Sequence, residues 1–160
     1  GLFLFSSSLN KLIKQITIFT IAHSITLIFI SLSLMRINPQ IVEPIIALTI
    51  VYVGVENIFK NYIKEYLRYV VILFFGLLHG LGFALVLSDI GYRSTDLFIN
   101  LISFNIGIEV AQISIILILY LLIALNFAKN KNYRIYFQVP SSILISSIGL
   151  YWFFERINFI

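Results

Sequence analysis

At 160 residues the chain has the length of one domain, and a composition that is 60% hydrophobic and only 11% charged excludes an ordinary soluble protein. The net charge of +4 does not indicate nucleic-acid binding, because the basic residues lie in short clusters between apolar runs and form no stripe with interleaved aromatics. The absence of cysteine excludes disulfides, thiolate metal ligands and cysteine nucleophiles. The composition therefore predicts an integral membrane protein.

The chain begins within an apolar run that has no charged region ahead of it, unlike a secretory signal. We interpret residues 1–9 as the stump of an upstream helix belonging to a longer chain, and residues 10–14 as a short basic turn. The later apolar runs predict an all-α fold, a polytopic helix bundle that forms a single transmembrane domain over residues 1–160. The five complete spans are expected at about residues 15–35, 41–59, 69–90, 97–127 and 140–156.

The fourth apolar run is longer than a bilayer requires. At a rise of ~1.5 Å per residue it exceeds a hydrocarbon core of ~30 Å, so it must tilt, protrude or break. Asn105 and Gly107 are the expected sites of distortion.

The basic residues predict the orientation, because cytoplasmic loops carry the excess of lysine and arginine. Alternate loops must lie on opposite sides of the membrane, and eight basic residues fall on one side against three on the other. We therefore expect the loops at residues 10–14, 60–68 and 129–134 to be cytoplasmic and the C-terminus to be outside. Glu43, at the start of the second span, is expected to be solvated.

Four of the five spans carry strongly polar residues, which are costly inside a bilayer and are functional candidates for that reason. These residues are His23 in the first span, Glu56 and Asn57 in the second, His79 in the third, and Asn105, Glu109 and Gln112 in the fourth. Counting from the nearest loop charges at ~1.5 Å per residue places His23, His79 and Glu109 near mid-membrane. Glu56 lies nearer the cytoplasmic face.

The sequence around His79 indicates close helix packing. Gly76, Gly80 and Ala84 recur every four residues, so they share one helix face and let a neighbouring backbone approach closely. His79 is therefore expected to press against other helices rather than to face lipid.

Imidazole and carboxylate groups without thiolate suit a divalent metal such as Zn, Ni, Co, Mn or Fe(II). The candidate ligands are His23, Glu56, His79 and Glu109, and the groups expected to orient them are Asn57, Asn105 and Gln112. Each also has a structural interpretation. A histidine, asparagine or glutamine can join helices by hydrogen bonds, and Glu56 can pair with Lys60, four residues on.

Four segments, at residues 19–27, 55–57, 75–84 and 104–112, resemble the HupE/UreJ-like membrane proteins. The resemblance implies a polytopic protein of the bacterial inner membrane, associated with hydrogenase and urease maturation, whose intramembrane His, Asp and Glu residues are linked to nickel uptake. His79 matches the histidine-glycine motif of the family, and His23, Glu56 and Glu109 match its other polar positions. The chain departs from the family pattern in one respect, because no histidine followed by an Asp-His pair precedes residue 9.

Three functions fit these observations. The first is a transporter or facilitator that passes a divalent cation, with Ni²⁺ favoured, along a ladder of weak sites. The second is an intramembrane Zn²⁺ enzyme acting on lipid or peptide, with Glu56 or Glu109 as general base. The third is a structural membrane subunit. The expected partners are the lipid bilayer and the metal ion, and the sequence leaves open whether the chain forms a homo-oligomer.

Overall fold

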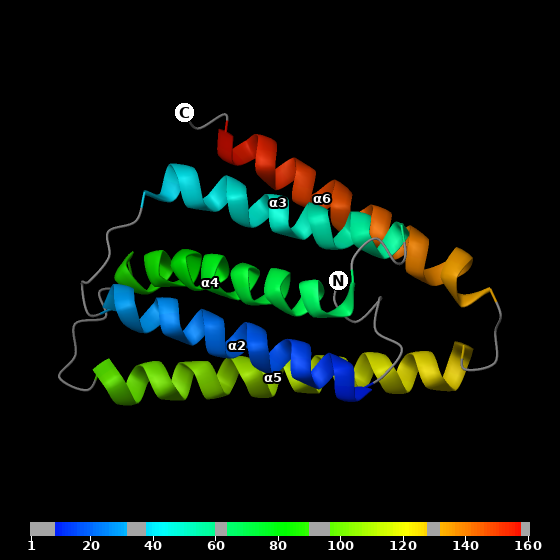
Figure 1. Cartoon of the computed structure of the whole chain (residues 1–160), viewed down its shortest axis with the longest axis horizontal. Coiled ribbons are helices and arrows are strands. Elements are labelled where there is room, and N and C mark those ends of the chain that lie inside the picture. Colours follow the sequence, from blue (N-terminus) through cyan, green and yellow to red (C-terminus); the bar gives the residue numbers. More distant parts are fainter. Residues whose placement is uncertain (1–8, 32–37, 60–63, 90–96, 128–131, 158–160) are drawn as a thin grey trace.

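The structure is a computed structural model that describes residues 9–31, 38–59, 64–89, 97–127 and 132–157 (Figure 1). These residues form helices and no strands. The helices are α2 (Leu9–Ser31), α3 (Pro39–Ile58), α4 (Glu65–Asp89), α5 (Leu97–Phe127) and α6 (Val139–Ile157), and the π-helical segment η1 (Arg134–Gln138) leads directly into α6. Within the described ranges, five helices are long and apolar enough to cross a membrane. The all-α transmembrane fold is therefore confirmed.

The helix ends differ from the prediction at three basic segments. Leu9 and the predicted turn at residues 10–14 belong to α2, where Lys11 and Lys14 are exposed while Leu12 is buried. Lysine is a good helix former, so charges on the outer face need not interrupt the helix. Residues 1–8, predicted to be the stump of an upstream helix, lie outside the described residues.

The second difference is ahead of α6, where η1 begins at Arg134 although the fifth span was expected from residue 140. The third is at the start of α4, which begins at Glu65 rather than at residue 69. Arg68, predicted to lie in a cytoplasmic loop, is therefore helical and buried. A buried cation is tolerated when it is paired with a carboxylate, and the structure supplies one, as described below.

Helix α5 runs for 31 residues without the break expected at Asn105 and Gly107. The Asn105 side chain donates a hydrogen bond from Nδ2 to the carbonyl of Leu101 at 2.9 Å, four residues earlier, so its amide is accommodated within the helix. A Cβ added at Gly107 would find nothing within 4 Å. The helix is therefore longer than the ~30 Å hydrocarbon core and must tilt or protrude.

The helices pack side by side in the order α6, α3, α4, α2 and α5 (Figure 1). Two pairs are the most closely packed, α3 with α6 and α2 with α4, and α3 also contacts α4 across the centre. Helix α5 contacts α2, and only a small part of its apolar surface is buried.

Glycine permits the close approach within both pairs. A Cβ at Gly76 or Gly80 of α4 would lie 2.5 Å from the carbonyl oxygen of Phe19 or His23, respectively, on α2. Gly54 of α3 stands similarly close to α6, with the carbonyl oxygen of Ser142 at 2.8 Å from a built Cβ. Gly76, Gly80 and Ala84 are all buried, as their four-residue spacing predicts.

Candidate functional site

His79 is held at the contact between α4 and α3. Its Nε2 lies 2.9 Å from the hydroxyl oxygen of Thr49, and that hydroxyl donates its hydrogen bond to the carbonyl of Ile46 at 2.7 Å. A hydroxyl has one proton, so with that proton on the Ile46 carbonyl, Thr49 accepts from the Nε2–H of His79. This tautomer leaves the Nδ1 lone pair of a neutral imidazole available to a ligand.

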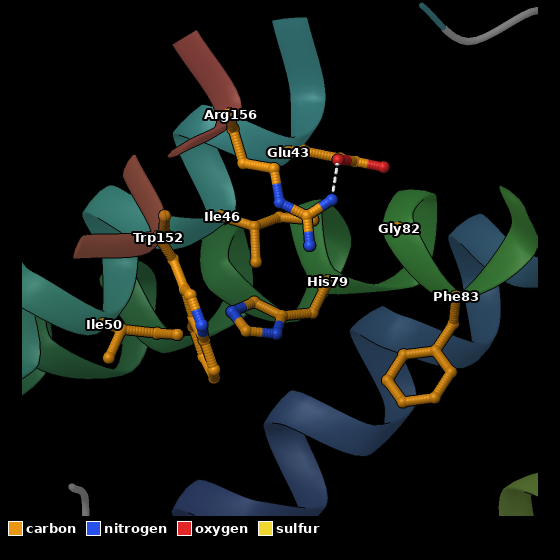
Figure 2. A pocket seen from close by; sticks show the side chains of 9 residues that line it. Glu43, Ile46, Ile50, His79, Gly82, Phe83, Trp152 and Arg156 are labelled. Carbon is orange, nitrogen blue, oxygen red and sulfur yellow. Dashed lines mark hydrogen bonds and ion pairs between the residues drawn. The ribbon is translucent and has the colours of Figure 1, made fainter. Parts of the chain in front are cut away.

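Two cavities meet at His79. The larger, of about 330 Å³, is lined by α3, α4 and α6 and includes Glu43, Trp152 and Arg156 (Figure 2). The smaller, of about 160 Å³, includes Thr49 and other residues of α2, α3, α4 and α6. His79 and Ile50 line both cavities. The imidazole is therefore accessible from two spaces that lie in the same seam of the bundle.

His23 lies on α2 next to this site and is 2% exposed. Its ring packs edge-on against Phe83, with ring centroids 5.0 Å apart, and is stacked on Phe19 at 6.1 Å. Phe19 also meets the ring of His79, at 5.3 Å. Among the described residues, neither ring nitrogen of His23 has a hydrogen-bond partner. Buried polar atoms are rarely left in that condition, so the neutral His23 ring offers one N–H donor and one lone pair to a further group beside the His79 site.

Glu56 forms an ion pair with an arginine side chain of the same chain. Its Oε1 accepts a hydrogen bond from Nη1 of Arg68 on α4 at 3.0 Å, and the side chains are only 7% and 5% exposed, respectively. Lys60, the predicted partner of Glu56, lies outside the described residues. Asn57 is fully buried, and its backbone carbonyl accepts from Nε2 of Gln138 in η1 at 3.2 Å.

The polar residues of α5 face α2. Oδ1 of Asn105 accepts from the hydroxyl of Ser24 at 2.8 Å, and the side chains of Gln112 and Thr20 meet at 3.5 Å. Glu109 lies between Asn105 and Gln112 in sequence and is half-buried. Asn105 and Gln112 therefore join α5 to α2, which is the structural interpretation that the sequence left open.

The predicted site residues are thus distributed over three places: the histidine pair at the centre, Glu56 and Asn57 near the end of α3, and the α5 residues against α2. No group of three or more His, Asp or Glu residues that could hold a metal ion occurs in the part of the chain that the structure describes. A metal site shared by His23, Glu56, His79 and Glu109 remains a prediction.

Sequence reasoning missed a polar pair at the rim of the larger cavity. Glu43, expected to be solvated, accepts a hydrogen bond from Arg156 of α6. The side chains are partly exposed, at 34% for Glu43 and 46% for Arg156. The signal in the sequence was weak, since it consists of opposite charges at the start of one span and the end of another, 113 positions apart.

Comparison with known proteins identifies a family. A family model described as "HupE / UreJ protein" matches residues 1–156, almost the whole chain. No curated protein and no solved structure gives a significant match.

Proposed function

Because the chain belongs to the HupE/UreJ family, we propose that it transports or facilitates the passage of a divalent metal cation across the membrane, with Ni²⁺ as the favoured cargo. The five apolar helices of the described residues fit an integral membrane protein. We further propose that it resides in the bacterial inner membrane with the loops at residues 10–14, 60–68 and 129–134 in the cytoplasm, in line with the distribution of lysine and arginine.

The observation that carries this proposal is the position of His79 between two cavities. A cation reaching the larger cavity meets the imidazole at one wall, and the smaller cavity continues from the same side chain. Neutral imidazole is a good ligand for Ni²⁺, Co²⁺ and Zn²⁺. His79 is therefore the central site of the proposed pathway.

Two neighbouring residues support this role. Thr49, by accepting from Nε2, fixes the tautomer that offers Nδ1 to the cation, as hydrogen-bonded neighbours commonly do for metal-binding histidines. His23 supplies one unprotonated ring nitrogen close by that has no hydrogen-bond partner among the described residues. A site with few protein ligands suits transport, because conduction requires each site to release the ion as well as to bind it.

The enzyme alternative is less well supported. A zinc hydrolase needs a carboxylate base beside the metal-bound water. Glu56, one of the two candidates for that base, is paired with Arg68, and Glu109, the other, lines neither of the two cavities at His79. For that reason we favour transport over hydrolysis.

Uptake of radioactive Ni²⁺ into vesicles that contain the purified protein tests the proposal. We expect His79→Ala to lower the initial uptake rate by at least about tenfold. Loss of a group that only orients a metal ligand already lowers metal affinity or activity by about tenfold or more. The matched control is Ile106→Ala, which also shortens an intramembrane side chain but at a position 57% exposed on α5. It should transport at the rate of the unaltered protein. The role of His79 is refuted if His79→Ala does so too, and the transport proposal is refuted if vesicles with the unaltered protein take up Ni²⁺ no faster than protein-free vesicles.

A further inference from the structure

Helix α3 carries a glutamate–arginine ion pair on each side of the His79 site. Glu43 pairs with Arg156 of α6, and Glu56 pairs with Arg68 of α4. At the helical rise, Glu43 and Glu56 stand about 9 Å and roughly 10 Å along the axis from Thr49, the residue that binds His79. Along the axis of α3, the His79 imidazole therefore lies between the two ion pairs.

The Glu43–Arg156 pair lies at the rim of the larger cavity. Both side chains line that cavity together with His79, and both are partly exposed. Figure 2 shows Arg156 reaching from α6 to Glu43 on α3, while His79 and Trp152 line the same space. A cation that approaches His79 from this end meets the Arg156 guanidinium on the Glu43 carboxylate.

The Glu56–Arg68 pair is buried near the opposite end of α3. Glu56 follows Val53, a residue of the smaller cavity, by one helical turn. Glu56 also lines a separate cavity of about 540 Å³, which includes Tyr52 and Phe59, at that end of the helix. The carboxylate thus stands between the smaller cavity and the end of the bundle.

We propose that the two ion pairs are the gates of the transport pathway, and that Glu43 and Glu56 are cation sites at which a divalent metal ion displaces the guanidinium. The inference rests on the proposed function. A guanidinium and a divalent cation both bind carboxylate oxygens and both are positively charged, so their repulsion disfavours binding of the two to one glutamate together. Because each arginine is tethered to a neighbouring helix, it returns to its glutamate once the ion moves to His79. With both pairs formed, both carboxylates are occupied, so a cation finds no free carboxylate on either side of His79.

The natural absence of cysteine makes gating measurable, because a single introduced cysteine is the only thiol in the chain. Ile46→Cys reports on the larger cavity and Val53→Cys on the smaller one. Each is reacted with a charged, membrane-impermeant methanethiosulfonate reagent, applied from either side of the membrane without metal. The labelling rate then measures whether each cavity is open.

Removing one arginine should open one cavity. We expect Arg156→Gln to speed labelling of Ile46→Cys by roughly threefold, as befits a partly exposed pair. Arg68→Gln should speed labelling of Val53→Cys by more than about tenfold, because its pair is buried. Each substitution should leave the other cavity unchanged. Exchanging the charges, with Glu43→Arg and Arg156→Glu together, should restore slow labelling.

Arg68→Gln leaves a buried carboxylate unpaired and can fail to fold, so the double variant Glu56→Gln with Arg68→Gln is tested beside it. This double variant has neither an unpaired charge nor an ion pair at this position. In it, Val53→Cys should react as fast as in the Arg68→Gln protein. Slow labelling in the double variant overturns the gate at Glu56.

The single tryptophan of the chain reports directly on the cation site. Trp152 lines the larger cavity with Glu43 and Arg156, so Ni²⁺ bound there quenches its fluorescence. We expect the Ni²⁺ concentration for half-quenching to rise roughly threefold in Glu43→Gln and to fall roughly threefold in Arg156→Gln. If both variants match the unaltered protein, Glu43 is not a cation site.

The outcomes separate the two proposals. If the gate variants speed labelling but vesicles with the unaltered protein take up no Ni²⁺, the two ion pairs control access to the cavities and the transport proposal fails. If no arginine variant and no double variant changes labelling, the gate inference fails whatever the uptake measurements show.

Discussion

Gly80→Ala should loosen the packing that holds the two histidines together. The added methyl group would lie 2.1 Å from Oγ1 of Thr26, 2.5 Å from the backbone carbonyl oxygen of His23 and 3.0 Å from Cβ of Thr26, where ordinary contacts begin at 3.4 Å. The Thr26 hydroxyl can rotate away but the carbonyl oxygen cannot, so α2 must move away from α4 by about 1 Å, the difference between the carbonyl distance and an ordinary contact.

Two effects lower the free energy of unfolding of the Gly80→Ala protein. Overpacking a close interface typically costs ~1–3 kcal/mol. The displacement also weakens the hydrogen bond from the Thr26 hydroxyl to the carbonyl of Leu77, which is 2.9 Å long. In a membrane such a bond contributes ~0.6 kcal/mol. A total of about 2 kcal/mol lowers the melting temperature of a chain of this size by about 4–8 °C.

The assay is the fraction of detergent-solubilised protein that remains monodisperse on size exclusion after heating. The matched control is Gly107→Ala, an identical substitution in another apolar helix, at a site where a Cβ meets nothing within 4 Å. The control should melt no lower than the unaltered protein. The packing argument is refuted if Gly80→Ala and Gly107→Ala have the same midpoint.

Two further predictions concern the polar contacts. Arg68→Ala should destabilise the protein by ~3–5 kcal/mol, because it leaves the Glu56 carboxylate buried without its cation. Glu56→Gln combined with Arg68→Met should recover most of that loss in the same thermal assay, and a double variant as unstable as the single one would contradict this explanation. Thr49→Val should lower Ni²⁺ uptake by about tenfold, because the hydroxyl no longer fixes the tautomer of His79. Thr49→Ser keeps the hydroxyl and should keep the uptake, whereas equal rates in the two variants would show that the hydrogen bond is irrelevant.

The helices were predictable because a bilayer imposes long apolar runs, and their close packing was predictable where small residues recur at helical spacing. Gly76, Gly80 and Ala84 illustrate this, since their four-residue period alone indicates a shared, buried face. The limits of the charged segments were harder to predict. Lysine and arginine mark membrane borders on average, yet both are good helix formers, and α2 and α4 continue through them.

The partners of the polar residues could not be predicted, because a helical pattern shows that a buried group needs a partner without showing which helix supplies it. For Glu56 the structure supplies Arg68 of the next helix, a partner that the spacing of residues within one helix does not indicate. For Asn105 the partner is Ser24, 81 positions away. Only the packing order of the helices decides between such alternatives.

The glycine contacts also determine where the bundle can change shape. Gly76 and Gly80 bring the backbones of α2 and α4 together, and Gly54 does the same for α3 and α6. The seam between the two pairs, where α3 meets α4, holds the cavities around His79 instead. Sliding one pair past the other therefore disrupts fewer close backbone contacts than separating the members of either pair. The two close helix pairs, α2 with α4 and α3 with α6, thus meet along the seam that holds the proposed ion pathway.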